Sequence, residues 1–437
     1  MYAQLRQSVS GIDTQKQESL RRRLLGEGVD KNVVHLGLTS LFTDISSEMI
    51  STILPLYLMF YLRLSPLQYG AVDGLYQGAS ALVRVFGGYA ADRWQRYKEV
   101  AGIGYALSAA SKLAMLAVGP AWGALAAIVL VDRTGKGIRT APRDALISLS
   151  SRSESLGVAF GVHRALDTAG AMLGPLIAFA ILTALPNAFD LVFVASFCAA
   201  VIGLGVLGLF VQNKSPRAQA ITRKTPVAWG EAFRLLRQPG IRNLTIVGTL
   251  LALATMSDGF VYLVLQRRLT FTASYIPLLY VVTSLFYLLL AVPMGRLADK
   301  VGRKQIFIGG YVLLLLVYIA LLLPSIGPVE MFTSLLLFGA YYAATDGILM
   351  ALATELLTPE IRTSGMAILT TATGLASLLA SLAFGALWTV WGAEVAAYVF
   401  LAGLVLALAA GVVLMVRHRG SGGILGVHAE AITAVEP

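Results

Sequence analysis

Residues 87–98 read GGYAADRWQRYK, and residues 295–304 read GRLADKVGRK. Both phrases stand at the end of a long apolar run and share the pattern Gly-x-x-x-Asp-(Arg/Lys)-x-x-Arg. Their aspartates, Asp92 and Asp299, are separated by close to half the length of the chain. Weaker echoes, GVAF and GMAI, open two later apolar runs at nearly the same offset. Repetition at one offset indicates an internal duplication, so the sequence predicts two similar halves.

The composition indicates a helical membrane protein. The chain of 437 residues is 57% hydrophobic and 13% charged, and its mean hydropathy is +0.74. Soluble domains carry about 25% charged residues. Apolar runs of about 20 residues recur along the chain, which is the length that a helix needs to cross the hydrocarbon layer. These unbroken runs do not show the alternation over about ten residues that a membrane β-barrel requires.

We predict an all-α membrane protein with twelve transmembrane helices in two pseudo-symmetric six-helix bundles. The predicted spans are 33–61, 67–87, 98–118, 121–142, 158–184, 189–211, 241–264, 274–294, 304–324, 329–355, 364–391 and 393–416. The predicted organisation is an N-terminal cytoplasmic segment 1–32, a bundle 33–211, a cytoplasmic linker 212–240, a bundle 241–416 and a cytoplasmic tail 417–437.

The linker contains the phrase WGEAFRLLRQ at 229–238, in which apolar and charged residues alternate at helical spacing. Such a segment fits either an amphipathic helix on the anionic inner leaflet or a plain linker helix.

The net charge of +10 follows the predicted topology. Lys and Arg gather in alternate loops, whereas the opposite loops carry only Arg63, Arg267 and Arg268. Because basic loops stay on the cytoplasmic side, this asymmetry places both termini in the cytoplasm. The charge therefore indicates orientation in a lipid bilayer, and we predict no nucleic-acid partner.

The chain resembles the major facilitator superfamily of transporters over about residues 33–416. The phrase at 87–98 is similar to the family's signature between helices two and three, and the phrase at 295–304 to its counterpart between helices eight and nine. In the family this turn closes the cytoplasmic side of the outward-facing state. The resemblance implies a cytoplasmic gate formed by Gly88, Asp92, Arg93, Arg96, Gly295, Asp299 and Arg303.

The fifth predicted span carries Gly161, Gly170, Gly174 and Pro175, a pattern similar to the family's antiporter motif. Closely spaced glycines allow tight helix packing, and a proline inside a helix deletes one backbone hydrogen bond. The pattern departs from the motif at residues 178–179, where alanine and phenylalanine stand in place of two glycines. The resemblance favours export over import.

The fourth predicted span carries Arg133-Thr-Gly-Lys136-Gly137, which resembles the family's Arg-x-x-Gln-Gly motif with lysine in place of glutamine. The resemblance implies that Arg133 takes part in proton transfer. Two further phrases, TDISSEM at 43–49 and GIRTAPRDALIS at 137–148, resemble an exporter-like bacterial branch of the superfamily.

Ionisable residues inside predicted spans suggest where coupling takes place. Asp44 and Glu48 are four positions apart and share one face of the first span. Two lipid-facing charges would cost about 5–7 kcal/mol on insertion scales. They must therefore face the interior, be paired or be protonated, and a carboxyl that exchanges a proton could couple transport to a proton gradient. The candidate residues for proton coupling or substrate binding, with Asp44 first, are Asp44, Glu48, Asp73, Arg133, His163, Arg164, Asp167, Asp258 and Asp346.

A set of aromatic residues in the second half fits a broad pocket for amphipathic or aromatic solutes, although packing and membrane-interface roles fit equally. The set is Tyr262, Tyr280, Phe286, Tyr287, Tyr341 and Tyr342.

The leading hypothesis is a monomeric proton-coupled antiporter that exports a small organic or drug-like compound across a bacterial inner membrane. The proton gradient supplies the energy, without a cofactor. A second hypothesis is transport of a metal ion such as iron, or of a metal chelate or siderophore, by Asp44, Glu48, Asp73, His163 and Asp167. A membrane sensor or enzyme is a third reading. We predict no enzyme, because the sequence has no zinc-ligand spacing, phosphate loop or nucleophile elbow.

Overall fold

The computed structural model describes residues 29–152, 155–214, 237–324, 327–357 and 362–416. Every long element among these residues is a helix, and the described chain contains no strand. The predicted all-α class is therefore confirmed. Residues 1–28, residues 215–236, which include most of the 229–238 phrase, and the tail 417–437 lie outside the described residues.

The first half contains six spans. Asp30 caps the first of them by accepting a 2.8 Å hydrogen bond from the backbone N–H of Asn32. Ser65 and Gln68 form a reciprocal capping box at the start of the second, with proline at its first position. The helices are α2 (Lys31–Leu56), which continues as a π-helical turn (Tyr57–Tyr61), α3 (Pro66–Trp94), α4 (Tyr97–Val118), α5 (Trp122–Leu149), α6 (Leu156–Ala184) and α7 (Phe189–Phe210).

The second half also contains six spans, but two of them are interrupted. The helices are α9 (Pro239–Leu253), α10 (Asp258–Leu269), the 3₁₀ turn η4 (Ala273–Tyr275), α11 (Ile276–Val301), α12 (Arg303–Leu321), α13 (Pro328–Thr345), α14 (Ile348–Leu356), α15 (Arg362–Trp391) and α16 (Ala393–Val416).

The interruptions correct the prediction that spans 241–264 and 329–355 are continuous. The first breaks between α9 and α10, where Ser257 takes an extended conformation and α10 starts at Asp258. The second breaks between α13 and α14 at Asp346 and Gly347, and Gly347 has φ +58°, a conformation that glycine favours. Interrupted helices are common where membrane transporters bind their substrates.

Nine spans of the described chain are long and apolar enough to cross a membrane by length and composition, with α9–α10 and α13–α14 each counted as one. The other three long helices of the described chain are α2, α3 and α5. Their lower hydropathy reflects the charged residues that they carry inside the molecule. Together they make twelve spans, as predicted.

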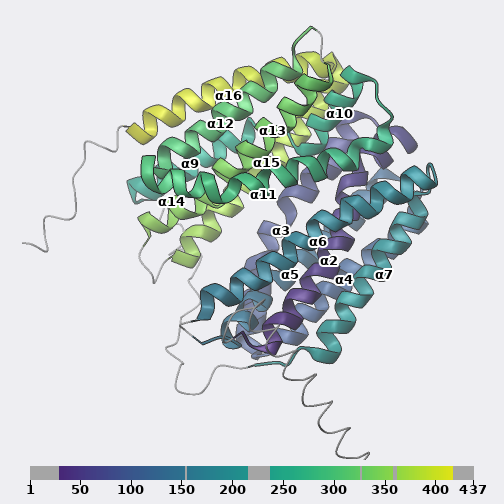
Figure 1. Cartoon of the computed structure of the whole chain (residues 1–437), viewed down its shortest axis with the longest axis vertical. Coiled ribbons are helices and arrows are strands. Elements are labelled where there is room, and N and C mark those ends of the chain that lie inside the picture. Colours follow the sequence, from purple (N-terminus) through teal and green to yellow (C-terminus); the bar gives the residue numbers. More distant parts are fainter. Residues whose placement is uncertain (1–28, 153–154, 215–236, 325–326, 358–361, 417–437) are drawn as a thin grey trace, which may run out of the picture.

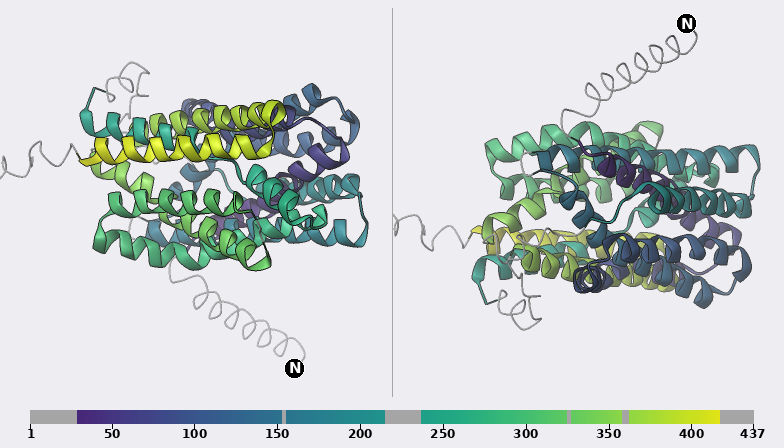
Figure 2. Two further views of the ribbon diagram at one scale, coloured as in Figure 1. Left: turned by 90° about the horizontal axis from the view of Figure 1, so that it is seen from above. Right: turned by 90° about the horizontal axis from the view of Figure 1, so that it is seen from below.

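The two halves lie side by side (Figure 1). In two further views the helices of both halves run in broadly the same direction (Figure 2). We call the end where α7 stops and α9 begins the linker end, and the end where η4 lies the far end. The ribbons of the two halves meet near α10 at the far end and diverge toward the linker end (Figure 1).

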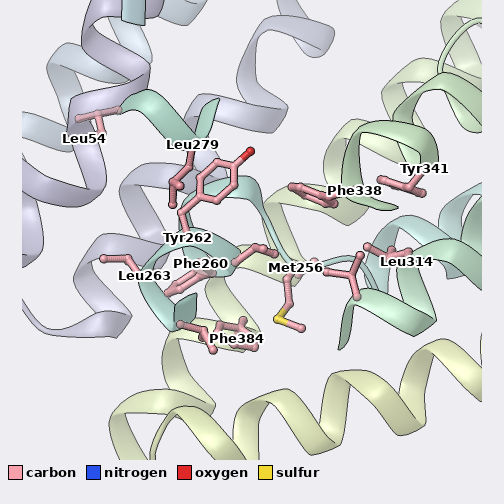
Figure 3. Close-up of a cluster of buried hydrophobic side chains, with 14 of the residues drawn as sticks. Leu54, Met256, Phe260, Tyr262, Leu263, Leu279, Leu314, Phe338, Tyr341 and Phe384 are labelled. Carbon is pink, nitrogen blue, oxygen red and sulfur yellow. The ribbon is translucent and has the colours of Figure 1, made fainter. Parts of the chain in front are cut away.

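A buried apolar cluster joins the halves around α10 (Figure 3). Phe260 is its centre: its ring lies 4.8 Å from that of Tyr69 in the first half and 4.7 Å from that of Phe384 in the second. Leu54 of α2 belongs to the same cluster. Aromatic pairs at such distances add to the free energy of burial, so this cluster stabilises contact between the halves.

A seam of small residues brings α3 and α15 together. Gly70, Gly74 and Gly78 recur at every fourth position of α3 and therefore share one face. A Cβ atom added at Gly74 would lie 2.7 Å from the carbonyl oxygen of Leu378, and one at Gly78 would lie 2.6 Å from that of Gly374. Only glycine permits this approach of two backbones, which is the small-xxx-small packing of membrane helices.

Candidate functional site

The halves are closed against each other at the far end. The backbone N–H of Leu67 donates to Thr389 Oγ1 at 2.9 Å, and the Phe179 ring lies 5.6 Å from that of Tyr275. In the seam, Ser381 Oγ donates to Asp73 Oδ2 at 2.7 Å. Asp73 is buried. Asp73, which the sequence predicts as a coupling or substrate residue, therefore makes a polar contact between the halves.

The second copy of the repeated phrase makes its ion pairs within its own half. Arg303 bonds to Asp299 at 3.0 Å and to Glu355 of α14 at 2.8 Å. A Cβ added at Gly295 would meet no atom within 4 Å. In the first copy Arg93 and Arg96 are exposed at the end of α3. The surroundings of Gly88 and Asp92 lie outside the described part of the structure.

Three deeply buried charged residues form a triad that was not predicted from the sequence. Asp132 pairs with Lys112 of α4 and with Arg133, its neighbour in the chain. Ser111 also donates to it at 3.2 Å. All three ionised groups are 2–3% exposed. Lys112 and Arg133 are thus ion-pair partners of Asp132. The sequence does show three charged residues within two adjacent apolar spans, which is the pattern that could have predicted a buried ion-pair cluster.

Arg133 also stacks on an aromatic ring. Its guanidinium carbon lies 3.7 Å from the centroid of the Tyr76 ring, a cation–π contact that holds the side chain between α5 and α3. Glu48 acts on Arg133 electrostatically and accepts a 2.6 Å hydrogen bond from Ser51.

Asp44 lies beside Asp167, and the two carboxyl groups interact directly. Asp44 also feels the positive charges of Lys136 and Arg139. Asp167 is 3.9 Å from Arg143 and 3.4 Å from Arg164. The structure therefore brings together predicted residues from α2 and α6 and surrounds them with basic residues of α5 that were not among the predicted site residues.

His163 has a separate partner. Its Nε2 lies 2.9 Å from Ser40 Oγ, which also accepts a 3.3 Å hydrogen bond from Arg143. His163 is buried, so the ring is held in place between α2 and α6 and linked through Ser40 to the basic residues of α5.

The glycine pattern of α6 explains why these groups approach so closely. A Cβ added at Gly174 would lie 2.7 Å from the Ile45 carbonyl oxygen and 2.9 Å from the Glu48 Cβ, and Gly170 is pressed against Leu41. Gly161, in contrast, faces open space. Pro175 is buried inside the helix. Two of the three predicted glycines thus bring α6 against the charged face of α2.

A cavity of about 150 Å³ lies where the interrupted helices meet. It combines two predicted acidic residues with four of the predicted aromatic residues. Its lining residues are Asp258, Tyr262, Tyr280, Thr283, Ser284, Tyr287, Tyr342 and Asp346.

The tyrosines orient the carboxylates of this cavity. Tyr342 donates a hydrogen bond to Asp258, and Tyr287 donates one to Asp346 at 3.2 Å. Arg164 of the first half interacts electrostatically with Tyr287 and Asp346 across the interface. The cavity therefore adjoins the charged face of α6.

The predicted metal ligands do not converge. Asp73 lies in the seam between α3 and α15, whereas Asp44 and Asp167 lie between α2 and α6. Within the described ranges no three His, Cys, Asp or Glu side chains gather as a metal site requires.

Twelve spans in two halves, with polar groups gathered where the halves meet, define an integral multi-pass membrane protein of the secondary transporter class. Matches to the Major Facilitator Superfamily cover residues 36–267 and 244–429, so the chain belongs to this family of transporters and is not an enzyme.

A relative that is 35% identical supports this assignment. The chain is 35% identical over 402 residues to an uncharacterized MFS-type transporter of Methanocaldococcus jannaschii, covering 89% of this chain and 95% of the relative. It is 26% identical to an uncharacterized protein of Mycobacterium tuberculosis over 249 residues, 54% of this chain and 58% of the relative.

The fold is similar to that of the nucleoside transporter NupG, with TM-score 0.70, 17% identity, and coverage of 88% of this chain and 98% of that one. It is similar also to a POT family transporter in complex with a thioalcohol-conjugated peptide, with TM-score 0.74, 14% identity, and coverage of 92% and 98%. At these identities the likeness shows the fold alone.

Proposed function

We propose that the chain is a secondary active transporter that exports a small organic compound by alternating access, in exchange for protons. The observation that carries the proposal is the interaction of the Asp44 carboxyl group with that of Asp167 between two membrane-spanning helices. Two adjacent carboxylates repel each other when both are ionised. Such a pair is suited to take up a proton and release it again during a transport cycle.

The surroundings of the pair support a role in coupling. Arg143 and Arg164 lie within 4 Å of Asp167, so a change of charge on the pair alters its attraction to two cations. Arg164 also interacts electrostatically with Tyr287 and Asp346 of the second half. Protonation of the pair would thus change an electrostatic interaction between the halves, as a device that couples protons to alternating access requires.

The orientation follows from the loops. The linker end carries the basic loops, so we place it in the cytoplasm of the cell's inner membrane, with both termini on that side. The conformation in which the two halves touch at the far end is then inward-facing. The Arg303 pairs within one half fit an open cytoplasmic gate, and the tight packing of Gly170 and Gly174 on α2 fits the exporter-like pattern of α6.

The test is flux in proteoliposomes under an imposed proton gradient, with an internal pH dye and a panel of drugs, siderophores and divalent metals. We expect substrate-dependent proton movement in the wild type and its loss in Asp44→Asn. The matched control is Asp190→Asn, which makes the same change at an exposed position at the start of α7. Proton movement that survives in Asp44→Asn would refute the role of the pair. Substrate flux without proton movement would refute proton coupling.

A further inference from the structure

We propose that the cavity between α10, α11 and α13 binds a small protonated aromatic amine. This inference names the substrate class of the proposed transporter and rests on that proposal only for the claim that the bound amine is transported. Binding itself is argued from the cavity.

The charges of the cavity favour a cation. Asp258 and Asp346 line it, and no Lys, Arg or His is among its lining residues. Two residues of the first half, Asp73 and Glu48, act electrostatically on Asp258, and both are acidic as well. The positive charge of Arg164 interacts with Asp346. Arg164 is not among the charged residues that have the largest electrostatic effect on Asp258. An ammonium group beside Asp258 would therefore compensate an excess of negative charge.

The partial charges at the helix ends beside the cavity also favour a cation. α13 ends at Thr345, immediately before the lining residue Asp346, and the C-terminus of a helix carries partial negative charge that stabilises cations. The N-terminus of α10 has the opposite sign, but Asp258 occupies its first position and neutralises it. Helix ends that face a central cavity are the devices by which interrupted transporter helices hold charged substrates.

The walls favour an aromatic cation over a bare metal ion. Four tyrosines line the cavity, and the rings of Tyr262 and Tyr280 pack edge to face with centroids 4.5 Å apart. Tyrosine faces attract ammonium groups by cation–π interaction and pack well against a ligand ring. A hydrated inorganic ion gains little from these walls. Tyr342 and Tyr287 already donate to the two carboxylates and so fix the acceptors that an ammonium would meet.

The volume limits the ligand. The cavity holds about 150 Å³, and a cavity of about that size accommodates a benzene ring in another protein. The ligand would thus place one ring with a short ammonium-bearing chain in the cavity. A larger hollow of about 590 Å³ lies at the linker end between α4 and α7. There Lys98 already donates to the Gly208 carbonyl at 2.8 Å.

The test uses three probes that share a ring and a chain but differ in charge: phenethylamine, phenethyl alcohol and phenylacetate. Binding to the purified full-length protein is measured by isothermal titration calorimetry without a gradient. We expect phenethylamine to bind, phenethyl alcohol to bind roughly tenfold or more weakly, and phenylacetate weaker still. We expect Asp258→Asn to lose roughly tenfold or more of the affinity for the amine. Asp190→Asn, which makes the same change far from the cavity, should bind as the wild type does.

Two further variants keep the result interpretable. Asp258→Glu retains the charge and should retain part of the affinity, which a purely structural role of Asp258 does not predict. Tyr280→Leu keeps an apolar wall and should weaken the amine several-fold more than the alcohol, because it removes the cation–π contact. Each variant is accepted only if its elution profile matches that of the wild type.

Several results would overturn the inference. These are no binding of phenethylamine at millimolar concentration, equal binding of all three probes, unchanged affinity in Asp258→Asn, or Asp258-dependent binding of Na⁺ or Ca²⁺ in place of the amine. Failure of the two proposals is distinguishable. Proton-coupled flux of another solute without amine binding would refute only the substrate class. Amine binding without proton-coupled flux would refute only the proton-coupled exporter.

Discussion

Gly74→Ala is a substitution whose effect can be derived from the structure. Gly74 lies in the seam between α3 and α15, in the part of the molecule where the halves are closed. An added Cβ would meet the Leu378 carbonyl oxygen at 2.7 Å and the Leu378 Cα at 3.3 Å. Both are backbone atoms, so no side chain can rotate away, and the two helices must separate.

The magnitude follows from two terms. Overpacking a tight contact costs about 1–3 kcal/mol, and this cost falls only on the conformation in which the seam is closed. Alanine also favours a helix over glycine by about 1 kcal/mol. Gly74 lies inside α3 in either conformation, so this gain does not change the balance between them. The closed seam should therefore lose about 5-fold to about 150-fold in population relative to the open one.

The assay is a distance distribution between spin labels at the far end. The native Cys198 is the only cysteine and is exposed, so it is first replaced by serine. Labels at Leu185 and Val329, both exposed at the far end of the two halves, report on separation there. Gly74→Ala should broaden the distribution toward longer distances. The control is Gly205→Ala, because an added Cβ at Gly205 meets nothing within 4 Å.

An unchanged distribution in Gly74→Ala would refute the reasoning that the glycine seam holds the far end closed. An equal change in the control variant would show that the effect comes from helix propensity and not from the seam.

Three further predictions follow from the polar contacts. Asp132→Asn leaves two buried cations without their carboxylate and should lower stability by about 3–5 kcal/mol, seen as a large fall in the melting temperature of the purified protein; an unchanged melting temperature would contradict the triad. Glu394→Gln weakens only a partly exposed ion pair with Arg268 and should shift stability by less than about 1 kcal/mol in the same measurement. Ser381→Ala removes the 2.7 Å hydrogen bond to the buried Asp73 and should weaken the closed far end by about 1–3 kcal/mol; spin-label distances identical to the wild type would argue against this contact.

Much of the fold could be predicted from the sequence, because membrane spans have a length and a composition that a single chain displays. The interruptions could not. The break at Asp346 and Gly347 depends on one glycine at positive φ, and glycine is also common inside intact membrane helices. The residues at the break before Asp258 do not predict it either. Serine and aspartate both occur within spans that stay continuous, as at Asp44 and Ser46.

The pairing of charges was harder to predict than their presence. Each intramembrane charge was visible in the sequence, but a partner is set by the rotation of one helix against another. Nothing in the sequence, for example, shows that Lys112 pairs with Asp132 and not with the carboxylates of α2. The GxxxG spacing at Gly70 and Gly74 was likewise present in the sequence and indicates close helix packing. It could not name α15 as the partner helix.

The two halves share a fold but have diverged in where they place their charge. The first half concentrates ionised groups in α2, α5 and α6, where carboxylates and basic residues compensate one another. The second half presents tyrosines and two carboxylates around interrupted helices, with no cation among the lining residues of the cavity. Glu48 interacts electrostatically with both Arg133 and Asp258. A proton or a cation that binds in one half therefore changes the electrostatic potential at the charged groups of the other half. Because coupling between sites is reciprocal, an organic cation bound beside Asp258 would favour release of a proton from the carboxylates of the first half, which is the exchange that an antiporter must perform.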